Sequence, residues 1–190
     1  MRLDEGILII LDEKGPLPLA ELCNEANTLF ENDGFTHDPS DIYKVLNRKK
    51  ELFSLQGGMV SIQPGKQPLC LTVNTELPGM GSYQVKVDFT KGYFTFIEWR
   101  DRDCPRFPGI SEPKNPGDIL IFKTKIYKSA IWNWDKTYYP EDGIILDGLS
   151  WSVKLKTTTT VYEKCGINKF PVKWKILSRG IRELTGYPFG

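Results

Sequence analysis

The residue types that most often carry acid–base or metal chemistry are scarce in this chain. His37 is its only histidine, which argues against most triads and histidine metal sites. Cys23, Cys70, Cys104 and Cys165 are far apart and form no C-x-x-C pair, the spacing that zinc and redox motifs commonly use. Neither a phosphate-binding G-x-x-x-x-G-K-[ST] loop nor a G-x-S-x-G elbow occurs. We therefore expect free thiols, no metal, no cofactor and no enzyme activity.

Two carboxylates form the best remaining candidate for catalysis. Asp88 is on one predicted strand, and Glu98-Trp99-Arg100 follows on its hairpin partner. This arrangement is similar to the D…E-x-K core of restriction-type nucleases, in which two carboxylates hold magnesium and a lysine supports the attacking water. Arg100 stands in the place of the lysine, and a guanidinium that stays protonated is a poor base. A metal-dependent nuclease is therefore a remote alternative.

A second group of residues is suited to binding. Ile42, Val45 and Leu46 are spaced as the buried side of a helix. The outward face of that helix and the residue just beyond it supply our predicted nucleic-acid-binding residues: Ser40, Tyr43, Lys44, Asn47, Arg48 and Lys50. Asparagine and arginine can read base edges, lysine and serine can hold phosphates, and the equivalent helix enters the major groove in helix-turn-helix proteins. The alternative is a solvated helix surface whose basic end is favoured by the helix dipole.

The last third of the chain contains a second candidate surface, made of basic and aromatic residues: Lys123, Lys125, Trp132, Trp134, Lys154 and Lys156. The two lysine pairs alternate with residues expected to point inward, so each pair is predicted on the solvent face of a strand. Basic strands beside exposed aromatic rings can hold single-stranded nucleic acid. We favour the simpler interpretation, in which the lysines protect a sheet edge and the tryptophans fill the core.

The predicted nucleic-acid-binding residues must be positioned by helices and a hairpin within residues 1–63. Apolar residues recur at helical spacing in three stretches up to Leu46. Asp38-Pro39 is typical of the N-cap and first position of the third helix. From Phe53 the apolar period changes to two, and Gly57-Gly58 supplies the positive φ of a tight hairpin turn. Three helices followed by a hairpin is the order of a winged helix.

The same region resembles the HARE-type winged helix over about the first third of the chain. The resemblance is carried by Gly15-Pro16-Leu17, by residues 38–42 and 48–53, and by Gly57-Gly58-Met59-Val60. Members of this family are linked to DNA, in restriction and chromatin proteins, and to protein contacts, in a bacterial RNA polymerase subunit. The resemblance implies a binding function and leaves the ligand open.

Residues 63–68 are predicted to link the first domain to a second domain, residues 69–190, because they include two prolines and a glycine. Alternating patterns predict strands at 83–89, 93–99, 119–127, 130–134, 151–155 and 161–164. From Phe170 to Leu184, apolar residues recur at helical spacing. We therefore predict an α+β protein: an N-terminal winged helix, then a mostly antiparallel β domain closed by a C-terminal helix.

The run Asp147-Gly148-x-x-Trp151, followed by Gly166-x-Asn168-x-x-Pro171, resembles a domain of many uncharacterised bacterial proteins. The resemblance covers about the last quarter of the chain and implies a bacterial or phage origin without an activity. Structural roles explain these residues. We expect a hairpin turn at Asp147-Gly148, a positive-φ bend at Gly166 and Asn168, and the start of the helix at Pro171.

Charge bears on the choice of partner. The chain has a net charge of +1, but residues 1–64 hold six basic and eleven acidic residues, a net charge of −5. Because duplex binding draws its affinity from phosphate neutralisation, an acidic module binds DNA poorly without sequence recognition. A DNA-binding regulator is our leading prediction, and a protein-interaction adaptor or immunity-associated partner is the alternative. No apolar run approaches the ~20 residues of a membrane span, and no signal-peptide pattern occurs, so we expect a cytoplasmic protein.

Overall fold

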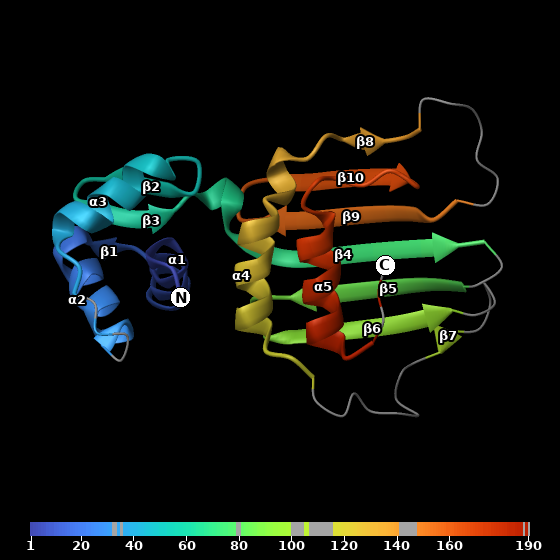
Figure 1. Ribbon diagram of the computed structural model, residues 1–190, viewed down its shortest axis with the longest axis horizontal. Helices are drawn as coiled ribbons and strands as arrows, with labels where there is room; N and C mark the ends of the chain where they lie inside the picture. Colours follow the sequence, from blue (N-terminus) through green and yellow to red (C-terminus); the bar gives the residue numbers. More distant parts are fainter. Residues whose placement is uncertain are drawn as a thin grey trace. The chain divides into compact units, whose positions relative to one another are not determined.

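The computed structural model is a mixed α+β structure (Figure 1). It describes residues 1–31, 34, 36–78, 81–99, 105–106, 116–140, 148–187 and 189. The chain divides into two compact units, Met1–Gln67 (unit 1) and Pro68–Gly190 (unit 2). Each unit has its own buried core, so each is described by itself.

Unit 1 contains three helices and a small antiparallel sheet. Its elements are α1 (Leu3–Lys14), β1 (Leu17–Pro18), α2 (Leu19–Leu29), α3 (Pro39–Arg48), β2 (Phe53–Gln56) and β3 (Met59–Ile62), followed by a short 3-10 helix, η2 (Pro64–Lys66). The strand order is β1-β3-β2. Gly57 and Gly58, with φ of 57° and 79°, make the two-residue turn between β2 and β3. Ile7, Leu22 and Ile42, one from each helix, are fully buried in the core.

Unit 2 is built on a seven-stranded sheet with the order β7-β6-β5-β4-β9-β10-β8. Its strands are β4 (Pro68–Leu77), β5 (Gly81–Asp88), β6 (Tyr93–Trp99), β7 (Pro105–Arg106), β8 (Thr137–Tyr138), β9 (Ser150–Thr157) and β10 (Val161–Ile167). Its helices are α4 (Ile119–Ser129), the 3-10 helix η4 (Ile131–Asn133) and α5 (Trp174–Thr185). Among the described strands, β10 and β8 pair in parallel and the other neighbours pair antiparallel. The predicted mostly antiparallel sheet and C-terminal helix are therefore confirmed.

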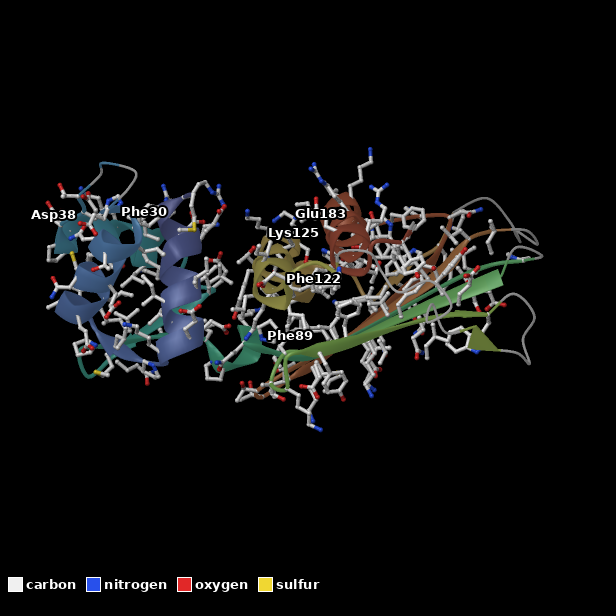
Figure 2. The ribbon with its side chains drawn as sticks, turned by 90° about the horizontal axis from the view of Figure 1, so that it is seen from below. Phe30, Asp38, Phe89, Phe122, Lys125 and Glu183 are labelled. Atoms are coloured by element: carbon white, nitrogen blue, oxygen red, sulfur yellow. The ribbon has the colours of Figure 1, made fainter. Side chains whose placement is uncertain are left out.

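Both α4 and α5 lie on one face of this sheet (Figures 1 and 2). Val73, Val85 and Val153 from three neighbouring strands are buried on the covered face, where Phe122 of α4 stacks on Phe89 with ring centroids 6.2 Å apart. The opposite face, which we call the open face, carries no helix among the described residues. It holds the side chains that alternate with the buried ones along each strand.

The strands predicted at 119–127 and 130–134 are wrong, because these residues form α4 and η4. Asp118 starts α4: its side chain accepts hydrogen bonds from the N–H groups of Leu120 at 2.6 Å and Ile121 at 3.0 Å. Phe122 and Ile126 then fall one turn apart on the buried side. The β-branched and aromatic residues of this segment suggest a strand, but the cap and the sheet-facing stripe outweigh that preference.

The positive-φ bend is confirmed at Asn168, with φ of 51°, but not at Gly166, which lies inside β10 without a positive φ. A Cβ at Gly166 would lie 2.6 Å from the carbonyl oxygen of Tyr138 and 2.8 Å from the Trp151 ring. This glycine therefore permits close packing rather than a turn. Pro171 precedes α5 by three residues, and Asp147 lies outside the described residues.

Candidate functional site

The outward side of α3 is formed by the predicted binding residues. Five of these residues are exposed: Ser40, Tyr43, Lys44, Asn47 and Arg48. The opposite side of the helix, which carries Ile42, Val45 and Leu46, is buried in the core of unit 1. Tyr43 keeps 48% of its surface exposed, a large fraction for an aromatic residue. The predicted exposure of this face is therefore confirmed. Its role in binding stays a prediction.

A capping box fixes the start of α3. The Asp38 carboxylate accepts hydrogen bonds from Ser40 N–H at 2.7 Å and Asp41 N–H at 3.0 Å. The Asp41 side chain accepts in return from Asp38 N–H at 3.5 Å. Hydrogen bonds from Ser40 and then Asp41 hold the pKa of Asp38 below its ordinary value. The first turn of α3 is thus held by its own side chains.

The cations of the α3 face differ in their pairing. Lys44 Nζ lies 3.0 Å from Asp41 Oδ1, and this hydrogen bond raises the pKa of the lysine. Arg48 and Lys50 are exposed and have no ion-pair partner among the described residues. Lys49 is half-buried, and its Nζ lies 3.9 Å from Oδ2 of the buried Asp4. Arg48 and Lys50 are therefore the cations most accessible to an anionic ligand.

The β2–β3 hairpin, which packs against α3, lacks positive charge. Residues 53–62 include no lysine or arginine. Leu55 and Met59, on either side of the turn, are 44% and 39% exposed. Of these two elements, α3 can therefore supply phosphate contacts, whereas the hairpin offers an apolar surface.

The lone histidine has a structural environment. His37 N–H donates to Asn27 Oδ1 at 2.7 Å, and its carbonyl accepts from Asn27 Nδ2 at 3.0 Å and from Cys23 Sγ at 3.2 Å. Its ring packs edge-on against Phe30 with centroids 5.4 Å apart. These contacts anchor the segment that leads into α3.

The second candidate surface, with its basic and aromatic residues, is not assembled. Lys123 is buried on α4 with Nζ 5.7 Å from the Phe89 ring centroid, and Lys125 forms an ion pair with Glu183 of α5 (Figure 2). The surface prediction fails because it assumed a strand where the chain forms a helix. The other four residues divide between core and sheet surface: Trp132 and Trp134 are buried, and Lys154 and Lys156 are exposed on the open face. The simpler interpretation is confirmed for the tryptophans, which fill the core. It is wrong for the lysines, because Lys123 and Lys125 belong to α4, and β9, which carries Lys154 and Lys156, lies between β4 and β10 rather than at a sheet edge.

The two carboxylates of the nuclease alternative do not meet. Asp88 pairs with Tyr93, and Glu98 pairs with Tyr83, so five ladder positions separate them. They therefore lie on opposite faces of the sheet and about 16 Å apart along the strands. Asp88 instead accepts hydrogen bonds from Thr90 N–H and Oγ1 and from Lys91 N–H, and its bond with Thr90 is the main cause of its lowered pKa.

The remaining candidates for chemistry, which are Arg100, the potential metal ligands and the cysteines, do not form a site among the described residues either. Arg100 lies outside the described residues, within which no three His, Cys, Asp or Glu side chains gather as a metal site. Cys23, Cys70 and Cys165 are free thiols, and Cys104 lies outside the described part of the chain. Nothing in the described residues therefore supports the nuclease alternative.

The open face of unit 2 contains a groove that we did not predict from the sequence. This polar groove has a volume of about 280 Å³, and its lining includes Asn74, Glu76, Ser82, Gln84, Trp99 and Ser152. Asparagine is depleted in strands, and Asn74 was therefore the available signal. The signal is weak because any solvent-facing side of a strand shows the same alternation of polar and apolar residues.

No family model matches the chain, and comparisons with curated proteins and with solved structures likewise find no match. The two family resemblances therefore stay predictions. Within the described residues, the helices are too short or too polar to cross a membrane.

Proposed function

We propose that unit 1 is a winged helix and that it binds duplex DNA through the exposed face of α3. The observation that carries the proposal is the simultaneous exposure of Ser40, Tyr43, Lys44, Asn47 and Arg48 on one capped helix. The order of three helices and a hairpin supports it. A helix presented in this way fits the major groove.

The chemistry divides among the residues of this face. Asn47 suits adenine and Arg48 suits guanine, because each can form two hydrogen bonds to one base edge. Lys44, Lys50 and Ser40 suit phosphate oxygens, which position the helix without reading sequence. The net charge of −5 over residues 1–64 keeps sequence-independent binding weak. Recognition then depends on the base contacts of α3.

A selection experiment tests this proposal. The full chain is used to select from a pool of random-sequence duplexes, and fluorescence anisotropy then measures the affinity for an enriched duplex. The double variant Lys44→Ala/Arg48→Ala should weaken binding by about tenfold or more, since one good base contact is worth about 1–3 kcal/mol. It should also reduce the slope of log affinity against log salt by about one to two.

The matched control is Lys173→Ala/Lys175→Ala, which removes two exposed lysines at the start of α5 in unit 2. It should bind the duplex as the unchanged protein does. Failure to enrich any duplex would contradict the proposal, as would equal weakening by the two double variants.

A protein partner is the second candidate, and the exposed apolar hairpin favours it. Leu55 and Met59 present an apolar surface on an acidic unit, which suits a partner with an apolar patch and a basic rim. Co-purification from the native host after nuclease treatment separates the two candidates. The variant Leu55→Ser/Met59→Ser should lose a protein complex that Lys44→Ala/Arg48→Ala retains, and the reverse result would exclude this candidate.

A further inference from the structure

The polar groove lies on the open face of the unit 2 sheet. Its floor is formed by β5, β4 and β9, which are neighbours in the sheet. The floor side chains alternate with Val73, Val85 and Val153, which are buried under the helices. They therefore point away from α4 and α5, and their polarity is not required by the core.

Hydrogen bonds join three floor side chains across these strands. Gln84 Nε2 donates to Asn74 Oδ1 at 2.8 Å, and Asn74 Nδ2 donates to Ser152 Oγ at 3.0 Å. The three residues lie directly opposite one another in the strand register. Each amide is thus oriented before a ligand arrives, which lowers the entropy cost of binding.

The same side chains keep further hydrogen-bonding capacity. An amide has two donors and an acceptor oxygen with two lone pairs. Among the described residues, Gln84 Oε1 and the second N–H of each amide have no partner. Ser152 accepts from Asn74 and retains its own proton for donation. The half-buried floor therefore offers donors and acceptors side by side, which matches hydroxyl groups because these donate and accept at once.

Charge indicates a neutral ligand. The groove is lined by no lysine or arginine among the described residues, and Glu76 adds a carboxylate to it. A carboxylate repels a phosphate, whereas a hydroxyl can donate a hydrogen bond to a carboxylate oxygen. Lys154 is outside the lining and forms an ion pair with Glu163 at 2.7 Å.

Trp99 gives the groove an apolar side. It pairs with Ser82 in the strand register, so both side chains are on the open face, and it is half-buried. A flat apolar ring beside oriented polar groups is typical of small-ligand sites. The volume of 280 Å³ lies just below the ~300–1,000 Å³ of pockets for drug-sized ligands, which suits a single sugar ring.

We infer that the polar groove binds a neutral carbohydrate. The hydroxyl groups of one pyranose ring would bond to Gln84, Asn74 and Ser152, and the C–H face of the ring would pack against Trp99. This site is independent of the DNA-binding proposal, because its residues belong to unit 2 alone.

Titration of the full chain tests the inference. The probes are neutral trisaccharides of glucose, mannose, galactose and N-acetylglucosamine. Their binding is measured by the amide NMR signals of the chain and by calorimetry. At least one trisaccharide should shift the signals of β4, β5 and β9. Asn74→Thr and Trp99→Ala should each weaken its binding by about tenfold, the cost of one good contact. Threonine favours strands more than asparagine does, so Asn74→Thr should retain the melting temperature.

The control is Thr95→Ala, on the open face of β6 but outside the groove lining, which should bind as the unchanged protein does. Two results would overturn the inference. One is the absence of signal shifts with every trisaccharide. The other is binding of a short single-stranded thymidine oligonucleotide that Asn74→Thr abolishes, which would assign the groove to nucleic acid.

Discussion

At His37 the backbone is held by a side chain rather than by a neighbouring strand. The Asn27 amide bonds to both the N–H and the carbonyl of His37, at 2.7 Å and 3.0 Å. These bonds connect α2 to the segment that enters α3. The position of the α3 face therefore depends on one amide of α2.

Replacing Asn27 tests this dependence. Asn27→Ala should lower the free energy of unfolding of unit 1 by about 1–3 kcal/mol, because it leaves part-buried backbone groups without these partners. Urea unfolding followed by NMR signals of unit 1 measures the change. Asn27→Asp keeps an acceptor for His37 N–H but turns a carboxylate oxygen toward the His37 carbonyl oxygen, so it should not restore the stability. Equal stability of Asn27→Ala and the unchanged protein would contradict this role.

Residue-level chemistry was predictable only where it is local. Asp38, Pro39 and the exposed α3 positions follow from spacing within a few turns. The polar groove is different, because Asn74 and Ser152 are 78 residues apart in the chain and meet only through the β4–β9 register. Sequence alone predicts polar strand positions but not which of them become neighbours.

At the scale of elements, the stability of α3 depends on the ionisation of its N-cap residue, Asp38. Because hydrogen bonds lower the pKa of Asp38 in the folded protein, its ionised carboxylate stabilises the fold above its unfolded pKa of about 3.9. That stabilisation is lost as the pH falls through the lower, folded pKa. The protection of the α3 amides, measured as exchange relative to the intrinsic rate at the same pH, should therefore decrease below about pH 4.

Two variants separate the cap from other acid effects. Asp38→Ser retains a capping oxygen without a charge, so its α3 exchange should respond less to acid. Asp38→Ala removes the cap and should exchange faster at every pH. If the three proteins show the same acid profile, the titrating group is not Asp38.

The elements of unit 1 were predictable because each one has its own local signals, such as Asp38-Pro39 and Gly57-Gly58. In unit 2, α4 was predicted as a strand because its residues 119–127 combine β-branched and aromatic types. The sheet supplied the missing information, since α4 forms where its apolar stripe can be buried against β-strands. Packing partners decide such segments, and a short sequence window does not include them.

Over the whole molecule, charge is unevenly divided. Residues 1–64 have a net charge of −5, although the whole chain is at +1. In the proposed DNA complex, this acidity disfavours sequence-independent binding to the phosphate backbone. The cations of α3 attract only the DNA groups that lie next to them. Such a module gains a high ratio of specific to non-specific affinity at the cost of absolute affinity. Affinity for selected and random duplexes should therefore be compared at the same salt concentration.

All five tryptophans, Trp99, Trp132, Trp134, Trp151 and Trp174, belong to unit 2. Three of them, Trp134, Trp151 and Trp174, form one cluster with ring centroids 4.8–6.3 Å apart. Excitation at the red edge of indole absorption therefore reports on unit 2 and leaves unit 1 optically silent. A sugar on Trp99 would alter the emission directly, whereas a duplex on α3 requires an external dye, so one sample can distinguish the two ligands by wavelength.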